Sequence, residues 1–297
     1  MSRLRGHVGI FLAAGLLCVV SVVALSSAAA TVDPSLTSRQ MIWIVLGVIV
    51  GLAAASIPYP WWTDLGVWLY LAAVLLLVAV ELAGAIKLGA VRWLSVFGLS
   101  VQPSELAKLA TACCVTRVLA TQPAPLPFRA VALSAAVVAL PAVLIFLQPD
   151  LGTSAILIAI WAGTIWVAGI PMRYLMGLGL VAAALVPLGW HLLHDYQRTR
   201  LLVFLNPNVD PLGAGYTIIQ STIAIGSGQW LGRGYLAGTQ NHLNFLPERQ
   251  TDFLYSVIGE EWGLLGSVAV VALFGYLLKR GTAIALVEAV KTSRSPA

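Results

Sequence analysis

The stretch LGVWLYLAAVLLLVAVELAG, residues 65–84, holds one charged residue in twenty. A helix rises 1.5 Å per residue, so about 20 apolar residues cross the hydrocarbon core of a bilayer. A segment this long and this apolar therefore predicts a transmembrane helix, and it sets the fold class for the rest of the chain.

The composition of the whole chain leads to the same fold class. Hydrophobic residues make up 59% of the 297 residues and charged residues 10%, whereas soluble domains carry about 25% charged residues. A soluble globular domain is excluded, because the chain cannot supply a charged surface. The formal charge of +5 does not indicate nucleic acid, since excess Lys and Arg in membrane proteins collects in cytoplasmic loops.

Hydropathy predicts an all-α, polytopic helical membrane protein of about eight transmembrane helices. A long, partly folded extracytoplasmic loop, about 194–252, comes before the last helix. Residues 1–280 are expected to form a single transmembrane domain, and 281–297 a divergent cytoplasmic tail. The predicted spans are 8–29, 41–58, 65–84, 104–120, 130–147, 151–170, 174–193 and 253–278.

The positive-inside rule gives the expected orientation. With both termini in the cytoplasm, most Lys and Arg residues of the short loops and tails fall on the inner face. The loop at 194–252 then lies outside the cell. It is rich in aromatic residues and glycine, so it is expected to fold against the bundle as amphipathic or re-entrant pieces.

Two motifs place ionisable side chains at the edges of predicted spans. In QPSELAKLA, residues 102–110, Glu105 and Lys108 share a helix face and can pair, either to orient helices or to line a polar site. In QPDLGTS, residues 148–154, Asp150 is placed to cap the sixth span.

The densest carboxylate cluster is FLPERQTDFLYSVIGEEWG, residues 245–263. From the residues alone, Asp252 is either the N-cap of the last span or a functional carboxylate. Glu260 and Glu261 point about 100° apart on a helix, so one is expected to face the cavity and the other to pair with an Arg or Lys of the bundle. The cysteines and histidines show no metal-binding spacing.

The segments RWLSVFGLSVQPSELAKLA, QPDLGTS and 196–266 together resemble the SEDS family, named for shape, elongation, division and sporulation. The resemblance runs from about residue 10 to 278 and is strongest to the rod-shape branch of the family. It implies a peptidoglycan glycosyltransferase of the bacterial cytoplasmic (inner) membrane, which polymerises lipid II into glycan strands for elongation. The implied partners are a class B penicillin-binding transpeptidase and the elongation machinery.

The resemblance also assigns roles to residues. The family motif PExxTDF contains its essential aspartate, which falls here on Asp252, with Thr251 then expected to cap the helix. Asp252 would act as general base on the sugar 4-hydroxyl, in a groove shared with Glu105 and Lys108. Candidate substrate-binding residues are Glu248, Arg198, Arg200, Arg233, Gln240, Glu105 and Lys108, with Arg249 as a further pyrophosphate ligand.

The cofactor and the alternatives to an enzyme are two points that remain open. No cofactor is certain, although Mg²⁺ or Mn²⁺ could share in neutralising the leaving pyrophosphate. After Leu278 the chain continues as KRGTAIALVEAVKTSRSPA, where the family has about two further spans. The missing spans favour a truncated scaffold without catalytic activity as one alternative to the enzyme. A lipid II flippase is another, because Glu105 and Lys108 within a span would suit a polar pathway.

Overall fold

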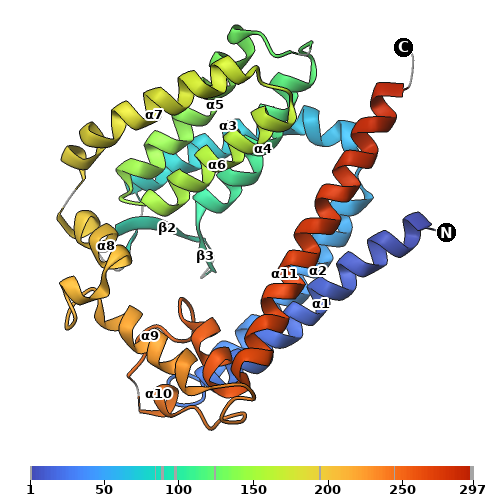
Figure 1. The fold of residues 1–297 in the computed structure, drawn as a ribbon. Helices are drawn as coiled ribbons and strands as arrows, with labels where there is room; N and C mark the ends of the chain where they lie inside the picture. Colours follow the sequence, from blue (N-terminus) through green and yellow to red (C-terminus); the bar gives the residue numbers. More distant parts are fainter. Residues whose placement is uncertain are drawn as a thin grey trace. The chain divides into compact units, whose positions relative to one another are not determined.

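The computed structural model describes residues 2–83, 85–87, 90–96, 99–123, 125–193, 195–243 and 245–294. It falls into two compact units (Figure 1). Unit 1 joins Met1–Gly51 to Leu192–Ala297, and unit 2 is Leu52–His191. The sequence-based prediction of one domain over 1–280 stays a prediction.

Unit 2 contains five helices and a small sheet in its described residues. The helices are α3 (Tyr59–Ala83), α4 (Pro103–Ala120), α5 (Phe128–Leu147), α6 (Leu151–Val167) and α7 (Met172–Leu192). The strands are β1 (Ala85–Lys87), β2 (Ala90–Val96) and β3 (Leu99–Val101).

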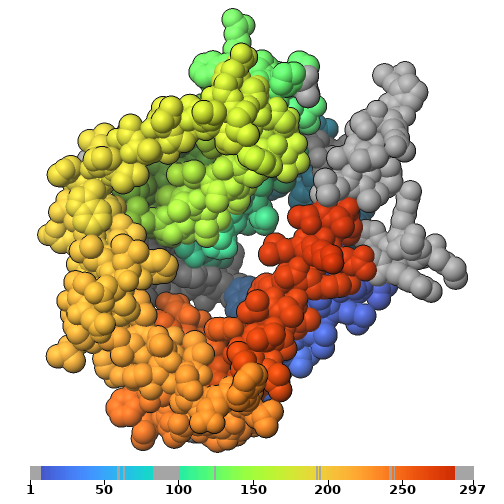
Figure 2. Space-filling model, in the orientation of Figure 1, coloured from blue at the N-terminus to red at the C-terminus, as the bar shows by residue number. Residues whose placement is uncertain are grey.

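Unit 1 combines the two ends of the chain. Its elements are α1 (Ser2–Ala28), most of α2 (Ser35–Ser56), α8 (Asp195–Leu205), η1 (Pro207–Val209), α9 (Tyr216–Ser227), α10 (Thr239–His242) and α11 (Leu254–Arg294). Helices α1 and α11 pack side by side, and α9 packs on α11. In the space-filling view, the side chains of α9 and α11 meet in one continuous surface (Figure 2).

Every predicted span falls on a helix, which confirms the polytopic helical class. Six helices in the described ranges are long and apolar enough to cross a membrane. Helix α6 is a shorter apolar helix, and α4 carries Glu105, Lys108 and Arg117 within its 18 residues. The last helix extends beyond the predicted edge at 278, to Arg294.

The core of unit 2 lies where α4 meets α3, α5 and α6. Leu77, Val115, Ile145 and Leu157 are fully buried there. Gly66 lets α3 approach α4 closely, since a Cβ at this position would lie 2.8 Å from the Cβ of Cys113. Small residues at helix contacts are the usual means of tight packing within a membrane.

No pattern in the sequence predicted the three-stranded antiparallel sheet between α3 and α4. Its order is β1-β2-β3, with Ile86 paired to Val91 and Leu94 paired to Val101. Two of the three strands are three residues long, which is too short for an alternating apolar pattern to stand out.

Two local predictions in unit 2 are confirmed. Asp150 caps α6, because its carboxylate accepts the backbone N–H of Thr153 at 3.2 Å and the Thr153 hydroxyl at 2.9 Å. Lys108 Nζ lies 2.9 Å from Glu105 Oε1. This pair is partly exposed, so it contributes little to stability by itself.

Candidate active site

Helix α11 is broken at Gly263, whose φ of 65° and ψ of −159° are not helical. The segment 254–262 reverses there and returns beside the segment after Gly263. Tyr255 donates a hydrogen bond to the Ser267 carbonyl at 3.3 Å, although 12 residues of straight helix would separate their backbones by about 18 Å. The prediction of one continuous span from 253 is therefore wrong. Re-entrant pieces were expected only within 194–252, whereas the chain turns back on itself after 254–262. This short segment is called the re-entrant helix below because of that reversal.

The loop after α9 satisfies the backbone groups that the break exposes. Interrupting a helix leaves carbonyl groups unpaired on one side and N–H groups on the other. The carbonyls of Glu260 and Glu261 accept the N–H groups of Arg233 and Gly234, each at 3.0 Å. In the same way, Leu264 N–H donates to the Gln229 carbonyl at 2.8 Å.

Glycines make this close approach possible. A Cβ on Gly232, where φ is +83°, would lie 2.1 Å from the Glu261 carbonyl oxygen. A Cβ on Gly228 would lie 1.9 Å from the Gly259 carbonyl oxygen. The glycine-rich loop is therefore needed where two backbones touch, and it fixes the loop to α11.

The motif PExxTDF forms a tight turn directly before α11. The Glu248 carbonyl accepts the N–H groups of Thr251, Asp252 and Phe253, at 3.1, 3.0 and 3.4 Å. Glu248 itself has φ of +49°, a left-handed conformation that non-glycine residues rarely adopt and that often marks a functional site.

This turn leaves Asp252 exposed. Its carboxylate makes no hydrogen bond or ion pair with any residue the structure describes. The N-cap reading is therefore wrong for Asp252. It is also wrong for Thr251, whose hydroxyl donates to the Glu248 carbonyl at 3.2 Å. A carboxylate kept out of internal hydrogen bonds can accept a proton from a substrate hydroxyl.

Arg249 anchors the turn to α1 and is not available to a substrate. It is 3% exposed. Its Nε donates to the Ala28 carbonyl at 3.0 Å, and an Nη donates to the Thr31 hydroxyl at 2.6 Å. Burial lowers the pKa of Arg249. The expectation that Arg249 binds pyrophosphate is corrected, because its guanidinium is buried and hydrogen-bonded within unit 1.

Glu260 and Glu261 are both buried, at 1% and 2% exposure, and contact different neighbours. The expected pairing of one of them with an Arg or Lys stays a prediction. Glu260 Oε1 accepts the Thr239 hydroxyl at 3.1 Å and the Gln240 N–H at 3.0 Å. Glu261 accepts the hydroxyl of Ser27 on α1. The two carboxylates therefore join α10 and α1 to the re-entrant helix.

The candidate substrate-binding residues of unit 1 fall into two groups. Arg233 and Gln240 belong to the segment held against α11. Arg198 and Arg200 lie on α8, which packs on η1. Arg200 is exposed. Arg198 Nη1 lies 3.4 Å from Asp195 Oδ1, within an ion pair. Glu248 is exposed and accepts a hydrogen bond from Gln250 at 3.3 Å.

Glu105 and Lys108 lie in unit 2. Asp252 lies in unit 1, and the groove that the three residues are expected to share stays a prediction.

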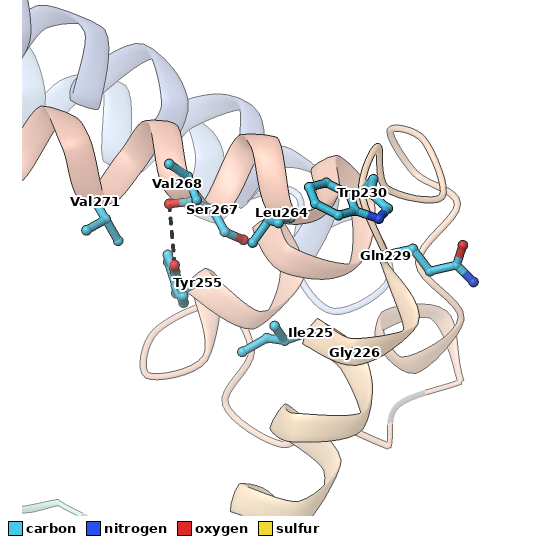
Figure 3. Close-up of a pocket in the computed structure, with 9 residues that line it drawn as sticks. All are labelled: Ile225, Gly226, Gln229, Trp230, Tyr255, Leu264, Ser267, Val268 and Val271. Atoms are coloured by element: carbon cyan, nitrogen blue, oxygen red, sulfur yellow. Dashed lines mark hydrogen bonds between the residues drawn. The ribbon is translucent and has the colours of Figure 1, made fainter.

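An apolar cavity of about 610 Å³ lies beside the re-entrant helix (Figure 3). Its walls include Ile225 of α9, Tyr255 of the re-entrant helix, and Leu264 and Val268 of the segment after the break. Tyr255 is three residues from Asp252 in the sequence, so the cavity and the exposed carboxylate belong to the same part of unit 1.

The described residues contain no cluster of three or more His, Cys, Asp or Glu side chains that could hold a metal ion. The protein groups in this part of the chain that could balance a phosphate are therefore its arginines and lysines.

The fold and the site define a polytopic helical membrane protein that presents an exposed carboxylate at the start of a re-entrant helix. The chain belongs to the FtsW/RodA/SpoVE family of cell cycle proteins, whose sequence profile matches residues 3–294. The family match thus extends on both sides of the resemblance seen from 10 to 278.

Two relatives of the chain are named for the same enzymatic activity. The chain is 41% identical over 258 residues to the peptidoglycan glycosyltransferase MrdB of Escherichia coli, covering 85% of this chain and 69% of that protein. It is 30% identical over 308 residues to the peptidoglycan glycosyltransferase RodA of Treponema pallidum, covering 80% and 71%. This chain belongs to the same class of enzyme, the peptidoglycan glycosyltransferases.

Two solved structures share the fold. One, described as the structural coordination of polymerization and crosslinking by a peptidoglycan synthase complex, has a TM-score of 0.78 at 34% identity. It covers 94% of this chain and 77% of the matched chain. The rod shape determining protein RodA of Thermus thermophilus has a TM-score of 0.65 at 28% identity, covering 94% and 75%.

Proposed function

We propose that this chain polymerises lipid II into glycan strands, with Asp252 as the general base. The observation that carries the proposal is the exposed Asp252 carboxylate, held by the PExxTDF turn and free of internal hydrogen bonds in the described part of the chain. The turn has a fixed position because Arg249 ties it to the end of α1.

The chemistry needs one base and one stabilised leaving group. The Asp252 carboxylate takes the proton of the acceptor sugar 4-hydroxyl as that oxygen forms a bond to the anomeric carbon of the donor. The bond between this carbon and the pyrophosphate oxygen breaks, and its electron pair leaves with undecaprenyl pyrophosphate. One carboxylate is sufficient for a displacement that inverts the anomeric centre.

The leaving pyrophosphate carries negative charge that cations must balance. Arg233, Arg198 and Arg200 are the proposed guanidinium ligands in unit 1, because guanidinium binds phosphate oxygens in a bidentate way. Gln240, Glu248, Glu105 and Lys108 are proposed to bind the sugar and peptide portions of the substrate. A divalent cation, Mg²⁺ or Mn²⁺, would supply further charge neutralisation if it enters with the pyrophosphate.

The proposed place of action is the outer face of the bacterial cytoplasmic membrane. The distribution of Lys and Arg over the short loops supports cytoplasmic termini and an extracytoplasmic position for Asp252. The proposed partner is a class B penicillin-binding transpeptidase, which fits the solved relative described as a peptidoglycan synthase complex. The similarity to MrdB and RodA supports a role in cell elongation.

Lipid II in detergent, given to the purified chain with its transpeptidase partner, tests the proposal. We expect glycan polymer from the wild type, and none from Asp252→Ala at an unchanged melting temperature. Equal polymer from both proteins would exclude Asp252 as the base.

A lipid II transporter is the alternative from another class, favoured by the Glu105–Lys108 pair within a helix. Liposomes that contain fluorescent lipid II distinguish it. A transporter would move lipid II between the leaflets without forming polymer. A scaffold would do neither, whereas the enzyme forms polymer that Asp252→Ala removes.

A further inference from the structure

Glu260 is a buried carboxylate without a cationic partner. It is 1% exposed, and no Lys or Arg of the described residues forms a salt bridge with it. Burying an ionised carboxylate is expensive unless hydrogen bonds offset the loss of water. The groups that bond to Glu260 therefore indicate what it does.

A chain of hydrogen bonds connects Glu260 to Arg233. Arg233 Nη1 donates to the Thr239 hydroxyl oxygen at 3.1 Å, and that hydroxyl lies 3.1 Å from Glu260 Oε1. A guanidinium can only donate and an ionised carboxylate can only accept. The Thr239 hydroxyl therefore accepts from Arg233 and donates to Glu260, which fixes the direction of the whole chain.

Further contacts keep both ends of this chain in place. The Arg233 backbone N–H donates to the Glu260 carbonyl at 3.0 Å. The Nε of the Arg233 side chain donates to the Ser227 carbonyl at 3.4 Å. Gly238 packs on the Glu260 carboxylate, since a Cβ there would lie 2.8 Å from Oε2. The Glu260 side chain thus has little room to turn away from Thr239.

These bonds occupy only part of the Arg233 guanidinium, which has five N–H donors. Arg233 is exposed and lines a hollow of about 430 Å³ formed by residues 227–233. Its remaining donors have no partner in the described part of the chain. The arrangement resembles a phosphate ligand that has been oriented before the phosphate arrives.

We propose that Glu260 is a positioning residue which, through Thr239, holds the Arg233 guanidinium ready for the pyrophosphate of the substrate. The inference rests on the proposed function for its substrate. It differs from a purely structural role for Glu260, because it requires coupling between Glu260, Thr239 and Arg233 in anion binding.

Binding of inorganic pyrophosphate to the full chain in detergent, measured by calorimetry, tests this without turnover. Arg233→Ala should weaken binding about tenfold or more, the value of a charge-assisted hydrogen bond. Thr239→Val keeps the side-chain shape and should weaken binding several-fold. The double variant should bind no more weakly than Arg233→Ala alone, since both changes remove one coupled unit.

Glu261 supplies the matched control at the neighbouring position. Glu260→Leu should weaken pyrophosphate binding, and Glu260→Gln should restore most of it because the amide oxygen can accept the same two hydrogen bonds. Glu261→Leu also removes a buried carboxylate, but one bonded to Ser27 of α1, and should leave binding unchanged. If Glu260→Leu does not fold, Thr239→Val decides the question.

Three results would overturn the proposal: no pyrophosphate binding by the wild type, wild-type binding by Thr239→Val, or additive losses in the double variant. Failure of the proposed function gives a different pattern. In that case pyrophosphate binding shows the coupling while the wild type forms no polymer from lipid II. Polymer formation without the coupling would reject only the role of Glu260.

Discussion

The break in α11 requires a positive φ at Gly263, and the substitution Gly263→Ala tests this requirement. Gly263 has φ of +65°, and a residue with a Cβ in such a region costs about 1–3 kcal/mol. The added Cβ would also lie 2.3 Å from the Gly232 backbone nitrogen and 2.8 Å from backbone atoms of Leu231. Relieving overlaps of this kind costs about 1–3 kcal/mol more.

The expected loss of unfolding free energy is therefore about 2–6 kcal/mol. At roughly 2–4 °C per kcal/mol, the melting temperature in detergent should fall by on the order of 10 °C. Gly275→Ala is the control on the same helix, because a Cβ there meets no atom within 4 Å in the described structure. We expect that change to be neutral or slightly stabilising, since alanine favours a helix over glycine by about 1 kcal/mol.

Thermal unfolding of the two purified variants, followed by circular dichroism, provides the comparison. If Gly263→Ala melts together with Gly275→Ala, the reversal at Gly263 is wrong. The position of Asp252 directly before a reversing helix would then be wrong too.

Three further changes test the contacts around the site and in unit 2. Arg249→Met should destabilise the chain by about 2–4 kcal/mol, because it removes the charge-assisted hydrogen bonds of a buried guanidinium. Arg200→Met, on the exposed face of α8, is the control and should leave the melting temperature unchanged. Equal effects of the two changes would refute the anchoring of the turn. Asp150→Ala should cost about 1 kcal/mol of unfolding free energy through loss of the α6 cap, with Asp150→Asn retaining most of it. A double-mutant cycle on Glu105 and Lys108 should give a coupling below about 1 kcal/mol in thermal unfolding; a larger value would mean that the pair is more buried than its exposure indicates.

Local patterns in the sequence were sufficient for the helices and their immediate contacts. The long apolar runs located the six helices that are long and apolar enough to cross a membrane in the described ranges, because a bilayer requires about 20 apolar residues whatever the tertiary contacts are. Asp150 and the Glu105–Lys108 pair were predicted correctly since capping and i,i+3 pairing depend only on residues within one turn. The burial of Glu260 and Glu261 followed from their position inside an apolar segment.

Contacts between distant segments could not be predicted in this way. Gly263 reads as an ordinary glycine within an apolar helix, and its break is visible only with the loop that satisfies the exposed backbone groups. Arg249 looked like a phosphate ligand because nothing in its neighbourhood in the sequence indicates Ala28, more than 200 residues earlier. The glycines of 226–238 were a usable signal, because their density marks backbones in close approach.

The central claim is that the Asp252 carboxylate performs the chemistry of glycan polymerisation. The most direct measurement is the rate of glycan polymer formation from lipid II by Asp252→Asn, which keeps the size of the side chain and removes its basicity. Asp33→Asn, at a partly exposed carboxylate of unit 1, is the control. We predict a loss of at least about 100-fold for Asp252→Asn, the usual contribution of a general base, and an unchanged rate for Asp33→Asn. Polymer formation by Asp252→Asn at the wild-type rate would contradict the account.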